Sequence, residues 1–295
     1  MSVLQSIIDA IALGALYALV AVGIALVFGV LRLVNFAHSE LITIGAYMLA
    51  ITSSWPRPLS IVLCLAASVG LALLTERIAF RPLRGAAPAT MLVTTFAVSF
   101  ALQAVWLTIW GPEGKSADVL GSLNRTAVNG DVVVRWVTLV ELAGGALILG
   151  GLVLLLTRTE IGLQMRAAAT DPRAARLLGV RADRVIAVAF ALAGLSAGIV
   201  ALLLTVQQPL VTPTFGLQIT ILALVGVVVG GMDRLTSATI GGFFVGLATS
   251  VLGDLLPSDD RVFLPSFVFL LVIVVLLVRP AGLFSPLRAT TVERV

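Results

Sequence analysis

Nine apolar runs separated by short polar connections constrain the fold of this chain more than any other feature. A helix crosses the hydrocarbon core of a bilayer in about 20 apolar residues, and satisfies its backbone polar groups internally. The runs that match or approach this length are Ile7–Val30, Asn35–Ser53, Leu59–Leu74, Pro88–Trp110, Thr138–Thr157, Val185–Thr205, Leu217–Gly231, Thr236–Leu255 and Phe263–Val278. We therefore predict an all-α polytopic transmembrane helix bundle with about 8–9 membrane segments, forming one domain over residues 1–295.

The composition excludes a soluble fold. Hydrophobic residues make up 59% of the chain and charged residues 12%, whereas a soluble domain carries about a quarter charged residues. Most of the surface must therefore meet the lipid bilayer. The basic residues lie between apolar runs, which indicates membrane orientation and no nucleic-acid partner. One cysteine and one histidine support neither a disulfide framework nor a Cys/His metal site.

The positive charges predict the orientation of the bundle. Threading nine spans places fourteen of the 19 Lys and Arg residues on one side and five on the other, and the richer side is normally cytoplasmic. The N-terminus is then outside, and the tail 285–295 is cytoplasmic. The four tryptophans fall at or near outer span ends, where they are enriched in membrane proteins. If Asn35–Ser53 is re-entrant instead, the N-terminus moves to the cytoplasmic side. Leu59–Leu74 and Leu217–Gly231 are short, and are tilted, broken or flanked by snorkelling residues.

Small residues spaced four apart let helix backbones approach closely in lipid. Glycine is common in membrane helices, so a single pair is weak support, but several pairs predict a densely packed C-terminal half. A similarity between Thr43–Tyr47 and Thr239–Phe243 also suggests an internal repeat. The predicted packing positions are Gly194, Gly198, Gly226, Gly230, Gly231, Gly241, Gly242 and Gly246.

The longest basic connection, residues 158–184, contains signals for a short helix. Asp171 can cap its start, Pro172 suits the first helical position, and Gly179 suits its end. A helix over Pro172–Leu178 is too short to be stable alone and needs a docking surface. It is either a headgroup-level helix held by its arginines or a coupling helix that inserts into a separate ATPase. The pattern favours neither.

A polar stripe marks the run Pro88–Trp110. Thr95, Ser99, Gln103, Trp106 and Trp110 are spaced by three or four residues and share one helix face. In lipid, such a face meets other helices or a solute path. Hydrogen bonding between helices is the simpler interpretation, but a polar solute crossing the membrane also needs such groups.

Asn35, His38 and Glu40 form a second candidate site at the start of Asn35–Ser53. Ionisable groups at membrane depth are costly and usually functional or paired. His38 could pair with Glu40 or form a latch, but a position at the cytoplasmic headgroup boundary is the favoured interpretation. For Glu40, structural and functional roles are equally supported.

Other functions find less support. Gly114-Lys115-Ser116 imitates the end of a phosphate-binding loop, but the glycine required five positions earlier is Ile109. The chain therefore shows no ATPase machinery of its own. An intramembrane enzyme needs several convergent catalytic groups, and only His38 with Glu40 could begin such a set. A stand-alone secondary transporter would depend on Glu40, Glu141 and Asp254.

Several motifs, taken together and in order, resemble the branched-chain amino acid ABC transporter permease family of the LivH/LivM type, closer to LivH. They are Asn35-Phe36-Ala37-His38-Ser39-Glu40, the loop from Gly162-Leu163-Gln164-Met165-Arg166-Ala167 to Leu177-Leu178-Gly179-Val180, Gly230-Gly231-Met232 with Ile240-Gly241-Gly242, and Arg279-Pro280-Ala281-Gly282-Leu283-Phe284. The chain departs from the family at Ser39, which usually is glycine, and at Asp233-Arg234, where Gly-Ser is favoured.

The resemblance implies a non-enzymatic permease of the bacterial inner membrane that works by alternating access. It implies a second related permease, two ABC ATPase subunits that bind ATP and Mg²⁺, and an extracytoplasmic solute-binding protein, with no cofactor on this chain. Branched-chain or related hydrophobic amino acids are the expected solutes, with amides or urea as an alternative. The residues expected to couple to the ATPase are Arg166, Asp171, Pro172, Ala174, Ala175, Leu178 and Gly179. Those expected along the solute pathway are Asn35, His38, Glu40, Thr95, Ser99 and Gln103.

Overall fold

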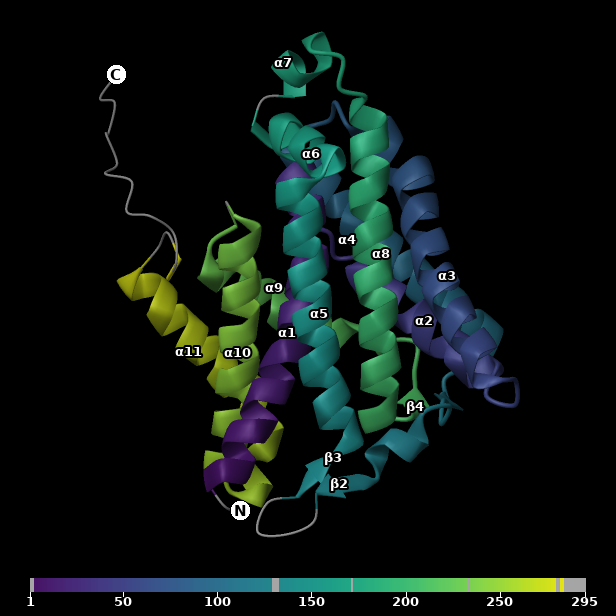
Figure 1. The fold of residues 1–295 in the computed structure, drawn as a ribbon, viewed down its shortest axis with the longest axis vertical. Coiled ribbons are helices and arrows are strands. Elements are labelled where there is room, and N and C mark those ends of the chain that lie inside the picture. Colours follow the sequence, from purple (N-terminus) through teal and green to yellow (C-terminus); the bar gives the residue numbers. More distant parts are fainter. Residues whose placement is uncertain (1–2, 129–132, 171, 233, 280–281, 284–295) are drawn as a thin grey trace.

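The computed structural model is a bundle of helices with only short strands at one end (Figure 1). It describes residues 3–128, 133–170, 172–232, 234–279 and 282–283. Within these residues, seven helices are long and apolar enough to cross a membrane, which supports the predicted multi-pass fold. Asp171 and the tail 285–295 lie outside the described residues.

The first half of the chain forms α1 (Val3–Leu31), α2 (His38–Ile51), α3 (Arg57–Thr75), the π-helical turn η1 (Glu76–Phe80), the 3₁₀ turn η2 (Arg81–Leu83) and α4 (Pro88–Trp110). A peripheral segment follows, with β1 (Lys115–Ser116), η3 (Gly121–Asn124), β2 (Thr126–Val128) and β3 (Val134–Arg135). The second half forms α5 (Trp136–Arg158), α6 (Glu160–Thr170), α7 (Pro172–Leu177), α8 (Ala182–Gln207), β4 (Leu210–Val211), α9 (Leu217–Gly230), α10 (Leu235–Leu255), η4 (Ser258–Phe263) and α11 (Leu264–Val278). Two antiparallel pairs, β1 with β4 and β2 with β3, close this periphery.

The predicted span Asn35–Ser53 differs from the structure, whereas Leu217–Gly231 is short, as predicted. Asn35–Ser53 and Leu217–Gly231 contain the 14-residue helices α2 and α9, each about 21 Å long at 1.5 Å per residue. That is less than the hydrocarbon thickness of about 30 Å. The segment 32–37 before α2 and the segment 208–216 before α9 are not helical, and the second contains the two residues of β4. The prediction that Leu59–Leu74 is short was also wrong, because its helix continues through η1 and η2 to Leu83.

The two halves of the bundle repeat one pattern in opposite directions. A long helix, an irregular segment, a 14-residue helix and another long helix occur as α1–α2–α3 and again as α8–α9–α10. Figure 1 shows α1 rising from the N-terminal end and α8 descending towards it. α1 packs against α8 and α10, and α8 packs against α1 and α3. The similarity between Thr43–Tyr47 and Thr239–Phe243 predicted a repeat that pairs α2 with α10, whereas the structural repeat pairs α2 with α9.

α1 and α8 form the centre of the bundle and are the two most buried of the candidate spans. α4, α5 and α11 lie at the periphery and expose large apolar side chains such as Phe100, Leu147 and Leu277. This is the reverse of a soluble protein, in which peripheral helices show a polar face. The outer surface therefore suits lipid or a partner chain.

The predicted packing glycines lie at close contacts between backbones. Gly194 and Gly198 of α8 lie against α3, and Gly246 of α10 lies against Gly14 of α1. In α9, Gly226 and Gly230 meet α10 at Gly241 and Gly242, where an added Cβ would lie under 3 Å from backbone atoms. Gly231 ends α9 with a φ of 103°, a conformation that favours glycine.

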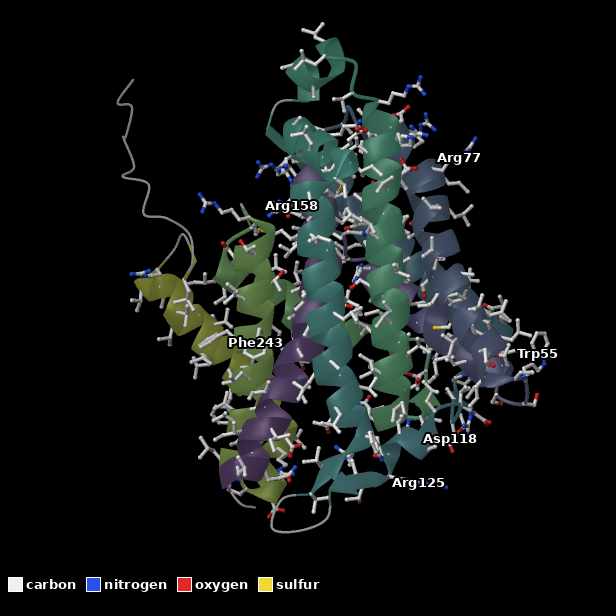
Figure 2. The ribbon with its side chains drawn as sticks, in the orientation of Figure 1. Trp55, Arg77, Asp118, Arg125, Arg158 and Phe243 are labelled. Atoms are coloured by element: carbon white, nitrogen blue, oxygen red, sulfur yellow. The ribbon has the colours of Figure 1, made fainter. Side chains whose placement is uncertain are left out.

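The two ends of the bundle carry different loops. Arg77 and Arg158 lie at the end occupied by α6 and α7, whereas Trp55, Asp118 and Arg125 lie towards the other end (Figure 2). The N-terminus is opposite α7 (Figure 1). The re-entrant alternative, which puts the N-terminus beside the arginine-rich loops, therefore does not hold.

Replacing Gly241 with alanine is expected to destabilise the bundle. The new Cβ would lie 2.1 Å from the carbonyl oxygen of Gly226 and 2.5 Å from the backbone of Gly230. Because backbone atoms cannot rotate away, we expect a loss of about 1–3 kcal/mol, measured as a lower midpoint of thermal unfolding in detergent. Gly144→Ala is the control, since its Cβ meets nothing within 4 Å. Equal midpoints for the two variants would contradict this packing.

Candidate functional site

Glu40 is the centre of a buried polar cluster. It lies in the first turn of α2, its side chain is 0% exposed, and four side chains donate hydrogen bonds to it. Ser39, Ser99 and Gln103 donate to Oε1, each at 3.0 Å, and Trp106 donates to Oε2 at 2.9 Å. A buried carboxylate is tolerated only when such donors replace its water.

Three of those donors come from the predicted stripe of α4, so this face of the helix points at α2. Gln103 also donates to Ser99 at 3.1 Å. Thr95 is buried too, but its hydroxyl bonds to the carbonyl of Leu92 in its own helix. The stripe thus holds α4 to α2 through one carboxylate, with Thr95 outside the cluster.

Aromatic rings flank this cluster on both sides. Trp110 stacks on Tyr47 of α2 with ring centroids 3.9 Å apart, and also on Trp106. Further along α4, Phe96 stacks on Phe36 at 3.9 Å. The rings exclude water from the carboxylate, which strengthens its hydrogen bonds.

Asn35 and His38 are buried but do not join Glu40. The side-chain oxygen of Asn35 accepts a hydrogen bond from the amide of Ala37 at 3.1 Å and so shapes the approach to α2. His38 packs against Gly23 of α1, and its ring nitrogens have no hydrogen-bond partner among the described residues. The ring is wholly buried inside the bundle, and its predicted place at the headgroup boundary stays a prediction.

The two short helices meet near this cluster. The amide of Gly216, just before α9, donates to the hydroxyl of Thr43 in α2 at 3.1 Å. Gly216 also lies so close to the carbonyl of Ser39 that a Cβ there would clash. The N-terminal ends of α2 and α9 are therefore neighbours, and helix N-termini carry partial positive charge.

The connection between α5 and α8 forms a compact unit, with α7 at Pro172–Leu177, one residue shorter than predicted, and an unpredicted helix, α6. Gly179 ends the turn with a φ of 84°, while Leu178 and Val180 donate backbone hydrogen bonds to Ala174 and Ala175. Arg166 lies on α6. The predicted cap, Asp171, is outside the described residues.

One face of this unit is buried and its tip is exposed. Ala175 is 3% exposed and belongs to an apolar cluster with residues of α1, α5, α6 and α8. Leu177 and Leu178, in contrast, are 89% and 83% exposed. α6 and α7 thus pack on the bundle, and the two leucines at the tip of α7 are exposed.

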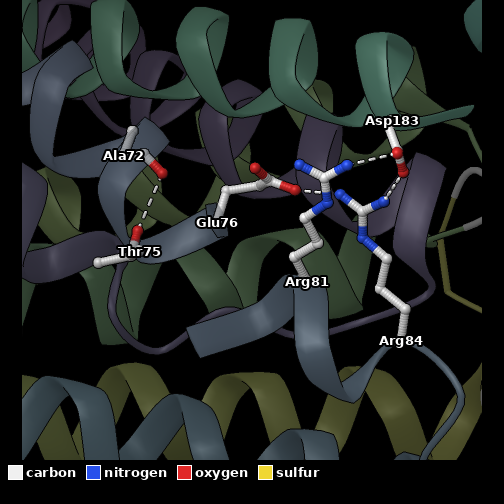
Figure 3. A network of polar contacts seen from close by, with 6 residues as sticks. All are labelled: Ala72, Thr75, Glu76, Arg81, Arg84 and Asp183. Carbon is white, nitrogen blue, oxygen red and sulfur yellow. Dashed lines mark hydrogen bonds and ion pairs between the residues drawn. The ribbon is translucent and has the colours of Figure 1, made fainter. Parts of the chain in front are cut away.

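An ion-pair network ties α8 to the end of α3 (Figure 3). The guanidinium of Arg84 pairs with both Glu76 and Asp183, and Arg81 pairs with Asp183 at 2.6 Å. Asp183 is the second residue of α8, immediately beyond the α7 connection. Sequence reasoning missed this network, because Arg81 and Asp183 are 102 residues apart.

A second buried carboxylate, Glu141 of α5, accepts a hydrogen bond from Gln207 at the end of α8. It lies among residues of the N-terminal end of the bundle, including Asp9 and Arg135. Of the carboxylates considered for an ion-driven transporter, Glu40 and Glu141 are both buried and both satisfied by amide or hydroxyl donors.

Comparison with known proteins adds to this geometry. Residues 6–278 match the family described as branched-chain amino acid transport system / permease component. The chain is 30% identical to the high-affinity branched-chain amino acid transport system permease protein BraD of Pseudomonas aeruginosa, over 96% of this chain and 95% of that protein. It is 29% identical to the corresponding LivH proteins of Salmonella typhimurium and Escherichia coli, with the same coverage.

Removing the carboxylate of Glu40 is expected to destabilise the bundle. Glu40→Leu leaves three α4 donors buried without this acceptor, at about 1–3 kcal/mol for each donor left unsatisfied. Glu40→Gln keeps one acceptor oxygen and should cost less. The thermal unfolding midpoint in detergent measures both effects, with Glu113→Leu in an exposed loop as control. Equal midpoints for Glu40→Leu and Glu113→Leu would show that the cluster does not hold α4.

Proposed function

Because the chain belongs to the family of branched-chain amino acid transport system permease components, we propose that it is the membrane-spanning permease of an ATP-driven importer. Leucine, isoleucine, valine or related hydrophobic amino acids are the proposed solutes. The names of relatives that match along nearly their whole length support this choice.

The proposed assembly contains a second related permease, two ATPase subunits that bind ATP and Mg²⁺, and an extracytoplasmic solute-binding protein. The proposed location is the bacterial inner membrane, with α6, α7 and the C-terminal tail cytoplasmic. The excess of arginine at the α7 end supports this orientation. Peripheral α4, α5 and α11 expose apolar side chains that suit lipid or the second permease.

The observation that carries the proposal is the exposed tip of α7. A helix lying at the headgroups would turn its leucines towards the bilayer. α7 instead stands beyond the end of α8 (Figure 1), and Leu177 and Leu178 are almost fully exposed there. Two adjacent exposed leucines on a helix that is itself packed on the bundle could insert into an apolar groove of an ATPase. This arrangement favours a coupling helix over a headgroup-level helix.

Two sets of contacts would transmit a movement of α7 to the rest of the bundle. The apolar cluster around Ala175 joins it to α1, α5 and α8. The ion pairs of Asp183 then join the start of α8 to the end of α3. α1 and α8 are the central helices, so a displaced α7 would rock both halves of the repeat. This is the proposed basis of alternating access.

The proposed solute path runs along the contact between α2, α4 and α9. A free amino acid carries an ammonium group and a carboxylate. The carboxylate of Glu40 suits the ammonium, while the neighbouring N-termini of α2 and α9 suit the carboxylate. In the structure Glu40 is closed off by Ser99, Gln103 and Trp106. Separation of α4 from α2 would therefore have to precede solute binding.

Reconstitution tests the proposed function directly. Proteoliposomes that contain this chain with its co-purified subunits should take up radiolabelled leucine when the binding protein and ATP are present, and not when ATP is withheld. Uptake of leucine by this chain alone, without ATP, would overturn the importer and indicate a secondary transporter.

Leu178→Asp should abolish both leucine uptake and co-purification of the ATPase subunits, because a charge would enter an apolar contact. The substitution lies on an exposed tip, so the thermal unfolding midpoint should stay unchanged. Val262→Asp, an exposed apolar position in η4 near the opposite end, is the matched control and should leave docking intact. Ala175→Arg is less informative, since Ala175 is buried and its replacement would unseat α7. Normal docking and uptake with Leu178→Asp would remove the coupling role of α7.

A further inference from the structure

A cavity of about 640 Å³ lies between the segment 208–216, the first two turns of α9 and the first turns of α11. We call it the outer cavity, because its wall includes Leu210 of β4, which lies towards the end of the bundle opposite α7 (Figure 1). Its volume is typical of small-molecule sites, which occupy about 300–1,000 Å³. The cavity is separate from the cluster around Glu40, because no residue of that cluster is among its described lining residues.

Four uncharged polar side chains line the outer cavity. Gln208, Thr212 and Thr214 precede α9, and Gln218 is the second residue of that helix. All except Thr212 are exposed, and none of the four side chains forms a hydrogen bond with another described residue. An amide or a hydroxyl can both donate and accept hydrogen bonds. These groups are therefore available to a polar ligand.

The part of the wall that lies further along the helices is apolar. Ile221 and Leu222 of α9 belong to it, and α11 contributes Pro265 and Phe269. No charged side chain is among the described residues that line the cavity. An apolar wall with a few polar groups is the usual composition of a small-molecule site. The outer cavity thus suits a small amphipathic molecule whose polar part needs neutral hydrogen-bonding groups.

A short stretch of backbone connects the outer cavity to the Glu40 cluster. Phe215 lines the cavity, and Gly216 next to it lies against the carbonyl of Ser39. The hydroxyl of Ser39 donates to Oε1 of Glu40 at 3.0 Å. The hydroxyl of Thr43 accepts a hydrogen bond from the amide of Gly216 at 3.1 Å and so holds this stretch against α2. Displacement of Phe215 and Gly216 would therefore join the cavity to the carboxylate.

We propose that the outer cavity is a second solute site, which holds a hydrophobic amino acid before it reaches Glu40. The ammonium and carboxylate of the solute would bind to the amide and hydroxyl groups of Thr214 and Gln218. Its aliphatic side chain would lie against Ile221 and Phe269. The inference rests on the proposed importer function, and adds to it a site on the extracytoplasmic side of Glu40.

The lining favours a hydrophobic amino acid over other occupants. An anionic headgroup or an inorganic ion would find no charged partner among the described lining residues. A lipid acyl chain would leave four polar side chains without partners, which is costly away from water. A solute on its way through a membrane protein must also be bound weakly enough to leave. A neutral first site, followed by the charged Glu40, meets that requirement.

Protection of an introduced cysteine tests the outer site in the full-length chain, purified with its accompanying subunits. Leu210 is 57% exposed and lines the cavity, so the Leu210→Cys variant should react with a membrane-impermeant maleimide. The natural Cys64 is wholly buried and should not react. Small-molecule sites enclose most of the surface of their ligand, so we expect saturating leucine, without ATP, to slow the labelling roughly tenfold.

Two controls make the protection specific. Glutamate at the same concentration should not protect Leu210→Cys, because its charged side chain has no partner in the apolar part of the wall. Leu255→Cys is the matched control variant, since Leu255 is 74% exposed at the end of α10 and does not line the cavity. Leucine should leave its labelling rate unchanged. Equal protection by glutamate, or equal slowing of Leu255→Cys, would overturn the proposal.

The same experiment separates the outer site from the importer function. Unprotected labelling of Leu210→Cys in a complex that imports leucine would overturn the outer site and leave the importer intact. Protection by leucine in a complex that fails to import it would support the outer site and overturn the importer.

A hydroxyl deletion tests the polar part of the wall. In the Leu210→Cys background, Thr214→Val should raise the leucine concentration that gives half-protection by about fivefold, the value of one ordinary hydrogen bond. Thr108→Val is the matched control, because this exposed hydroxyl of α4 bonds to the carbonyl of Ala104 in its own helix, outside the cavity. Gln218→Leu provides a second test of the same wall. An unchanged half-protecting concentration in both Thr214→Val and Gln218→Leu would overturn the proposal.

Discussion

Hydrocarbon offers no hydrogen bonds to a peptide backbone, and this constraint shapes the whole bundle. The chain is interrupted at 32–37 and again at 208–216, and each interruption frees backbone polar groups that lipid cannot satisfy. The structure buries most of the first segment and the end of the second at Phe215 and Gly216. It also supplies local partners, such as Asn35 for the amide of Ala37 and Thr43 for that of Gly216. The glycine contacts between α9 and α10 follow from the same need, since a short helix must be packed closely to be shielded.

The interruptions also create what a continuous helix cannot provide. They bring two helix N-termini together inside the protein and place Glu40 in the first turn of one of them. α4 otherwise makes few contacts with the bundle, and meets it chiefly through α2 and the end of α3. The hydrogen bonds to Glu40 and the aromatic stacks therefore hold α4 against α2. They are also the contacts that would break if α4 separated from α2.

The arginine-rich end combines rigid and breakable contacts. Apolar packing around Ala175 seats α7 firmly. The pairs of Asp183 with Arg81 and Arg84 involve partly exposed groups, and exposed ion pairs contribute little net stability. Such contacts can break and re-form at small cost as α8 moves.

The sequence by itself determined the lipid environment, the long spans, the shared face of the α4 stripe, the turn at Gly179 and the glycine spacing. Each of these depends on composition or on neighbours within a turn or two of the chain. It left open the true length of α2, because an apolar run has the same composition whether it is helical or irregular. Only the tertiary structure decided that Ser99 and Trp106 bond to a carboxylate 59 and 66 residues away, that His38 turns to α1, and that Arg84 meets Asp183. Such contacts depend on how distant helices cross and on the depth at which they do so, and local periodicity carries no information about either.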